Sequence, residues 1–177
     1  MRILAVVWGV LEATLFFIVP DVLLSLVAVN RPARALRVSC WTMAGALVGG
    51  AMMYGWGVQD SDRALAIVER LPAISEPMVQ GVTVELQEQG LSSAVFGAWR
   101  GVPYKIYAVQ AHATGHGLLP FLLISIPARW LRFFAVGALG AIIGRRLPKA
   151  WEPRKKRRLL LVLWIIFYTG FFSFMPN

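Results

Sequence analysis

A single carboxylate stands inside the first apolar stretch of the chain. Glu12 lies in the middle of residues 3–19, and Pro20 and Asp21 follow this stretch directly. A carboxylate at membrane depth costs about 3 kcal/mol on insertion scales, so membrane proteins rarely keep one there without a use for it. Proline breaks a helix, and the apolar run resumes after it. Residues 3–29 are therefore predicted to form a broken or re-entrant helix hairpin that carries a functional carboxylate.

The second half of the chain supplies residues of opposite charge. Arg100 and Lys105 enclose a break between two apolar runs, and Arg129 and Arg132 stand three residues apart. Side chains at that spacing share one face of a helix, which suits a bidentate grip on a phosphate or a pair with a carboxylate. We expect these cations to face the carboxylates of the first hairpin and to compensate them in part.

Each of these positions also has a purely structural interpretation. The two neighbouring arginines could snorkel from the start of a helix to the membrane interface, as long basic side chains do. Glu12 could form a structural ion pair, and Asp21 could cap the helix that follows Pro20. Residue types and spacing alone leave these alternatives open.

Two histidines raise the question of a metal site. His112 and His116 are four residues apart, a spacing that can hold a metal on one face of a helix. No third ligand stands nearby, so a packed histidine or a proton relay is the preferred interpretation. Cys40 is the only cysteine, which excludes an intrachain disulfide and a site of several thiolates. We expect no metal and no other cofactor.

The composition is that of a membrane protein. Of the 177 residues, 58% are hydrophobic and 15% are charged, and the mean hydropathy is +0.63, more apolar than the usual globular mixture. The net charge of +9 comes from basic residues beside apolar segments, which predicts topology signals rather than a nucleic-acid site. A cleaved secretory signal is disfavoured because Glu12 interrupts the apolar core. We expect one integral membrane domain over residues 1–177.

Hydropathy divides the rest of the chain into further segments. The glycine pairs Gly45/Gly49 and Gly140/Gly144 would allow neighbouring helices to pack closely, unless they are merely tolerated membrane composition. Residues 58–90 form an acidic segment, which is interpreted as a solvated connector outside the membrane. It should contain two short amphipathic helices, the second of which ends near Gly90. The segments are a crossing at 38–57, this acidic segment at 58–90, an interrupted apolar region at 91–126, a crossing at 127–144 and a final crossing at 159–175.

Two basic loops set the expected topology. Residues 31–37 and 145–158 are rich in arginine and lysine, and short loops of that kind stay in the cytoplasm. Placing both loops on one side requires an even number of crossings between them. The interrupted region 91–126 must then enter and leave on the same side, as a second re-entrant hairpin would.

The predicted fold is an all-α integral membrane protein with two inverted repeats. The repeats comprise residues 3–57 and 91–144, each a re-entrant broken-helix hairpin followed by a transmembrane helix, with an extra C-terminal transmembrane helix at 159–175. Inverted repeats of this kind place a binding site where the broken elements meet near the midplane.

These motifs together resemble the DedA family, also called the VTT-domain or SNARE-associated Golgi-type membrane proteins, and its YqaA-like branch in particular. The resemblance covers residues 8 to about 144 and leaves the final crossing outside. The matching stretches are Leu11-Glu12-Ala13-Thr14-Leu15-Phe16-Phe17-Ile18-Val19-Pro20-Asp21-Val22-Leu23-Leu24, Arg31-Pro32 with Arg34-Ala35, the glycine-rich span ending in Tyr54-Gly55, Val102-Pro103-Tyr104-Lys105, and Arg129 with Arg132-Phe133-Phe134.

The resemblance implies a transporter rather than an enzyme. Similar proteins are implicated in moving phosphate-bearing lipids such as undecaprenyl phosphate between leaflets, as flippases or scramblases driven by a proton or sodium gradient. The implied location is a bacterial inner membrane, with several crossings, cytoplasmic basic loops and membrane lipids as partners. Oligomeric state is left open. The roles implied are substrate binding by Arg100, Lys105, Arg129 and Arg132, and proton coupling by Glu12 and Asp21.

Two other functions stay in consideration. Gln110 and His112 depart from the alanine and glycine that the family tends to have there, which leaves the substrate open. A membrane-embedded phospholipid-processing enzyme would use His112 or His116 as a base, although no serine, cysteine or acidic partner stands at a recognised spacing. A non-transporting assembly factor would need no site at all.

Overall fold

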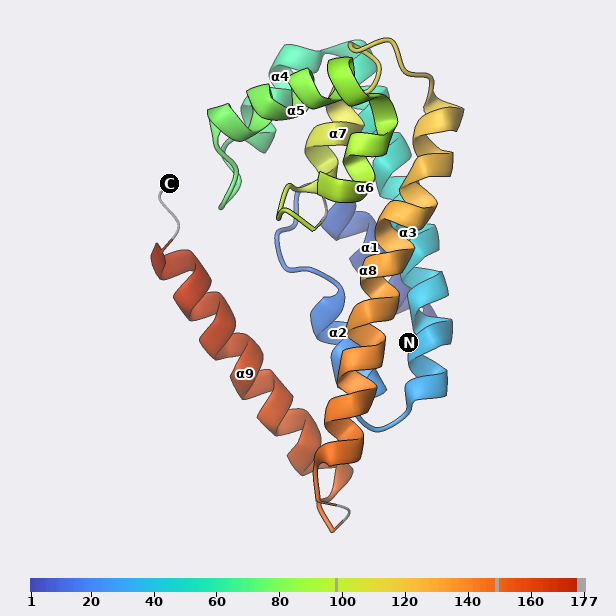
Figure 1. The fold of residues 1–177 in the computed structure, drawn as a ribbon, viewed down its shortest axis with the longest axis vertical. Coiled ribbons are helices and arrows are strands. Elements are labelled where there is room, and N and C mark those ends of the chain that lie inside the picture. The colour runs from blue at the N-terminus through green and yellow to red at the C-terminus, as the bar shows by residue number, and fades with distance from the viewer. Residues whose placement is uncertain (98, 149, 175–177) are drawn as a thin grey trace.

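A computed structural model of the chain describes residues 1–97, 99–148 and 150–174, and these residues contain helices and no strand. Figure 1 shows the long helices α3 and α8 side by side, with the shorter helices gathered around them and α9 at one side. Residue 175, the last residue of the predicted final crossing, lies outside the described residues. The helices are α1 (Arg2–Ala13), α2 (Asp21–Ala28), α3 (Pro32–Gln59), α4 (Ser61–Val68), α5 (Glu76–Gln89), the 3₁₀ helix η1 (Gly90–Ser92), α6 (Ser93–Gly97), α7 (Tyr104–Gln110), α8 (Leu118–Arg146) and α9 (Pro153–Phe174).

The first hairpin is a helix, a break and a second helix, as predicted. α1 ends at Ala13, residues 14–20 are not helical, and α2 starts directly after Pro20. The indole of Trp8 donates a hydrogen bond of 3.0 Å to the carbonyl of Ile18, which holds the break against α1. The Trp8 side chain thus supplies a hydrogen bond to a backbone carbonyl that has no helical partner in the break.

Close glycine contacts fix the directions of the helices. A Cβ atom on Gly45 of α3 would collide with the carbonyl oxygen of Val6, and one on Gly49 would press on Val10, so α1 runs parallel to α3. In the same way Gly140 of α8 lies against Ser25 and Ala28 of α2, and Gly144 lies against Val29 just after it, so α2 runs parallel to α8. Because α3 and α8 run in opposite directions (Figure 1), α1 and α2 form a true hairpin. The prediction that both glycine pairs serve close packing is confirmed.

Gly45→Ala is expected to destabilise the protein by about 1 to 3 kcal/mol, because the added methyl group overlaps the backbone of α1. Gly55→Ala is the matched control on the same helix, since nothing lies within 4 Å of its added Cβ. That change should leave stability unchanged or raise it by up to about 1 kcal/mol through helix propensity. Thermal unfolding in detergent micelles measures both. Equal effects of the two substitutions would contradict the packing described here.

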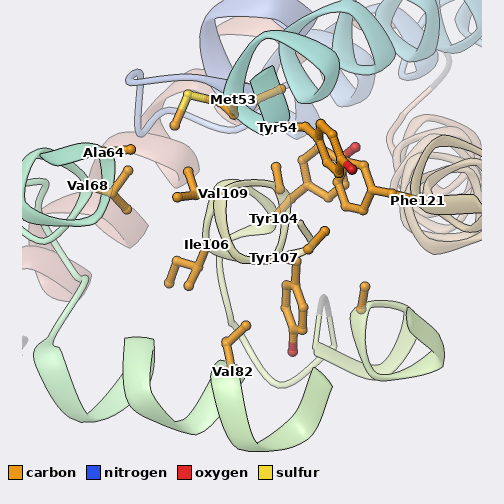
Figure 2. Packing of buried hydrophobic residues seen from close by; sticks show 14 of the residues in the cluster. Met53, Tyr54, Ala64, Val68, Val82, Tyr104, Ile106, Tyr107, Val109 and Phe121 are labelled. Carbon is orange, nitrogen blue, oxygen red and sulfur yellow. The ribbon is translucent and has the colours of Figure 1, made fainter. Parts of the chain in front are cut away.

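The acidic segment 58–90 is more than a solvated connector. It forms two helices and ends at Gly90 as predicted, but α4 and α5 bury Ala64, Val68, Val82 and Leu86 against α7. Figure 2 shows α7 between Ala64, Val68 and Val82 of these two helices and residues of α3 and α8. Apolar side chains at helical spacing prefer burial to solvent, so this segment covers the short helix of the second half.

The second half breaks before α7, near Arg100 and Lys105, as predicted, but its next break lies elsewhere than predicted. Pro127, expected to open a new segment, lies inside α8. The apolar run from 106 to 126 is instead interrupted at 111–117, where Gly115 adopts φ +84°. A proline removes one intrahelical hydrogen bond, which a helix of 29 residues can accommodate, whereas a positive φ ends the helix.

The two basic loops lie at the same end of the molecule. Asn30 Nδ2 donates a hydrogen bond of 3.2 Å to the carbonyl of Pro153, and Gly144 lies against Val29. At the opposite end, Gly90 lies near His116, so the region between them enters and leaves at that one end.

Among the described residues, two helices are long and apolar enough to cross a membrane, α8 and α9. α3 contains the predicted crossing 38–57 and has 28 residues, but it is not one of these two helices. α9 begins at Pro153, six residues before the predicted crossing, because proline suits the first turn of a helix and the basic residues after it form the next turns.

Candidate functional site

The break in the first hairpin meets the start of α7. Pro103 provides an extended backbone before α7, which places Lys105 in its first turn. The Nζ atom of Lys105 donates a hydrogen bond of 2.8 Å to the carbonyl of Phe16, and the residue is only 4% exposed. Two segments 89 residues apart in sequence are thus joined through one buried cation.

A buried ion pair connects the first hairpin to α8. Arg129 Nη2 donates to Glu12 Oε2, and both side chains are almost completely buried. The guanidinium of Arg129 also lies 4.5 Å from the centre of the Tyr104 ring, a cation–π distance. The hydroxyl of Tyr104 donates to Ser125 Oγ at 2.8 Å, which fixes the ring beneath the guanidinium. Glu12 and Arg129 therefore meet as predicted.

Arg132 forms the second pair with the hairpin. Its Nε and Nη2 atoms donate to Asp21 Oδ2 at 3.0 and 2.8 Å. Asp21 is the first residue of α2 and makes no capping hydrogen bond, so the capping interpretation is wrong. Arg129 and Arg132 use the same face of α8 toward the hairpin, as their spacing predicted, and each takes one carboxylate.

Arg100 has a partner that sequence reasoning missed. Its Nη1 atom lies 2.8 Å from Glu85 Oε1, and the hydroxyl of Tyr107 donates to the other oxygen of Glu85 at 2.7 Å. The Arg100 side chain is 49% exposed, so this pair is weaker than the buried ones. The available signal was that Glu85 follows Val82 by three residues and therefore shares the apolar face of α5.

The charged side chains surround one cavity. It has a volume of about 510 Å³, within the range of small-molecule sites. Asp21 does not line this cavity but holds Arg132, which does. The remaining walls are mostly apolar, with aromatic side chains of the first break and of α9. The charged lining residues are Glu12, Arg100, Lys105, Arg129 and Arg132.

Several polar atoms here keep hydrogen-bonding capacity. Arg129 Nε and Asp21 Oδ1 are buried and have no hydrogen-bond partner among the described residues. The ammonium of Lys105 has three donors and gives one of them to Phe16. Buried polar groups normally find partners. A ligand with several acceptor oxygens and negative charge would match the three cations Lys105, Arg129 and Arg132, which line this cavity.

The two histidines are not part of the cavity lining. His112 and His116 lie in the non-helical segment 111–117, so they do not share a helix face as their spacing suggested. Tyr54 donates to the carbonyl of His116 at 2.9 Å, and its hydroxyl lies 3.4 Å from His112 Nδ1. His116 Nε2 lies 3.2 Å from the carbonyl of Leu86. Both histidines therefore support the turn between α7 and α8. Within the described ranges, no three metal-ligating side chains come together.

Comparisons with known proteins place the chain near one curated relative. It is 25% identical over 156 residues to a protein of Haemophilus influenzae described as an uncharacterized protein, covering 88% of this chain and 78% of the relative. No protein-family model matches the sequence, and no solved structure matches it. The similarity extends over nearly all of the fold described above.

Proposed function

We propose that this chain is an integral membrane transporter that moves a phosphate-bearing lipid between leaflets. The observation that carries the proposal is the cavity itself, where Lys105, Arg129 and Arg132 converge beside Glu12 with apolar walls around them. Cations with free donors suit a phosphate head, and apolar walls suit the chain attached to it. The resemblance to the DedA family points to the same class of substrate.

The membrane arrangement forms part of the proposal. α8 and α9 would cross, α3 would cross beside them with its small residues packed on α1, and both basic loops would face the cytoplasm of a bacterial inner membrane. α1 and α2 would then form a re-entrant hairpin, and α6 and α7 a second one. The opposite directions of α3 and α8 fit two inverted repeats whose broken elements meet at the cavity.

The ion pairs suggest how transport could be coupled to protons. Each arginine is held by a carboxylate, Arg129 by Glu12 and Arg132 by Asp21. A lipid phosphate would compete with the carboxylates for the same donors, and protonation of a carboxylate would release its arginine to the phosphate. Loss of that proton on the other side would restore the ion pair and expel the phosphate. The cycle uses only groups that line or support the cavity.

The test is lipid movement in proteoliposomes. Arg132→Ala is expected to reduce the rate for a fluorescent lipid monophosphate by about tenfold or more, because a charge-assisted contact to the phosphate is lost. Arg63→Ala, an exposed arginine of α4 that does not line the cavity, should transport at the wild-type rate.

The outcomes separate the alternatives. If Arg132→Ala and Glu12→Gln both transport at the wild-type rate, the proposed mechanism is wrong. An assembly factor would show no flux in any variant. A phospholipid-processing enzyme would release a cleaved product, and a double substitution of His112 and His116 would abolish that release.

A further inference from the structure

α9 forms a wall of the cavity with its aromatic face. Phe167, Tyr168, Phe171 and Phe172 all line the cavity, and their spacing places them on one side of the helix. Figure 1 shows α9 diverging from α8, with α2 between the two helices. α9 lies outside the family resemblance, so nothing in that resemblance assigns a role to this face.

Specific contacts hold this face toward the charged groups. The Tyr168 hydroxyl accepts a hydrogen bond of 3.1 Å from the backbone N–H of Val19, in the break of the first hairpin. Trp164 Nε1 donates to Ser25 Oγ at 2.9 Å, one turn along α2 from Asp21. Phe172 meets Phe17 edge-on, with ring centres 5.3 Å apart. α9 is therefore aligned on the hairpin that supplies both carboxylates.

The aromatic wall and the cations form two ends of one site. From 167 to 172 the helix rises about 7.5 Å, so the wall extends beyond the space that a phosphate needs. Lys105, Arg129 and Arg132 line the same cavity from α7 and α8. The opposite face of α9 is different, because Ile166 is 62% exposed and lines no part of the cavity.

We propose that the aromatic face of α9 binds the apolar chain of the same molecule whose phosphate is held by the cations of α7 and α8. The substrate class is therefore an amphiphile with a monophosphate head and a long apolar chain, and a free phosphate would bind only weakly. Phe171 and Phe172 determine the preference for the chain. This inference rests on the proposed function, since it adds the part of that site that binds the apolar chain of the substrate.

The experiment uses photocrosslinking in proteoliposomes of the full-length protein. Benzoylphenylalanine replaces Phe171 in one variant and the exposed Ile166 in a matched control, and the probes are radiolabelled hexadecyl phosphate and hexadecanol. At position 171, hexadecyl phosphate should label about tenfold more than hexadecanol, because the phosphate contacts add to the affinity of the chain. At position 166 the two probes should label equally.

Competition makes the test independent of folding. Excess unlabelled hexadecyl phosphate should remove the label at position 171, while excess hexadecanol or inorganic phosphate should not. Arg132→Ala should reduce labelling at 171 by hexadecyl phosphate without changing labelling at 166. Equal labelling of position 171 by both probes, or labelling that survives competition, would overturn the inference.

Failure of transport has a different signature. If the wild-type protein moves no lipid but position 171 keeps its preference for hexadecyl phosphate, the chain site stands and the transport proposal is wrong. If lipid moves but position 171 shows no preference, transport stands and the role of α9 is wrong.

Discussion

Arg129→Gln is expected to lower the free energy of unfolding by about 3 to 5 kcal/mol, because it leaves Glu12 buried without its ionic partner. The substitution also removes the guanidinium that lies over the Tyr104 ring. Chemical denaturation of the protein in detergent micelles measures the change. This is the largest effect on stability that the structure predicts for a single charged residue.

The double variant Glu12→Gln/Arg129→Gln serves as the internal control. It should recover a large part of the lost stability, because two neutral amides replace two buried charges and no unpaired charge remains. Arg63→Gln, at an exposed position, should change stability by less than about 0.5 kcal/mol. A single Arg129→Gln variant as stable as the wild type would mean that this pair is not buried in the folded protein.

Lys105→Met is expected to weaken binding of hexadecyl phosphate by about ten- to a hundredfold, since a charge-assisted hydrogen bond contributes about 1.5 to 3 kcal/mol. Methionine keeps a similar length and apolar stem, so packing in the first turn of α7 changes little. Lys105 is buried and has donors beyond the one that Phe16 accepts. Isothermal titration in detergent measures the affinity.

Lys155→Met is the matched control for that experiment. Lys155 is an exposed lysine of α9 that lies over the Trp151 ring and does not line the cavity. Its replacement should leave the affinity within about twofold of the wild type. If both lysine variants lose affinity equally, binding reflects general positive charge rather than the cavity.

Local features of the chain were predictable where one residue type largely determines the local structure. A proline is costly inside a helix, and Pro20 directly precedes the first residue of α2, so a break in the first hairpin followed from the sequence. Gly45 and Gly49 mark a bare helix face, and that face packs on α1 as expected. The unusual placement of Glu12 in an apolar run correctly indicated a buried partner, which is Arg129.

Other features depend on contacts between distant segments and were not predictable. Glu85 pairs with Arg100 only because α5 folds over α7, and nothing near either residue specifies that packing. The break at 111–117 was assigned to Pro127 because proline is the stronger local signal, although the long helix α8 accommodates it. The orientation of the aromatic face of α9 toward the cavity was not predicted, because it depends on contacts with the distant first hairpin.

The charges of the candidate site illustrate both situations. Their signs and approximate positions followed from the sequence, and five of the six predicted residues line one cavity. The pairing was not predictable, because Arg129 and Arg132 share a face and either could have met Glu12. Only the depth of the hairpin relative to α8 determines that Arg132 takes Asp21.

The most direct measurement of the central claim is the ratio of two affinities in the wild-type protein. Hexadecyl phosphate and hexadecanol share a chain and differ only in the head that the buried cations would hold. Isothermal titration should give at least about a hundredfold preference for the phosphate, because several charge-assisted contacts are gained together. Equal affinity for the two molecules would contradict a phosphate site formed by Lys105, Arg129 and Arg132.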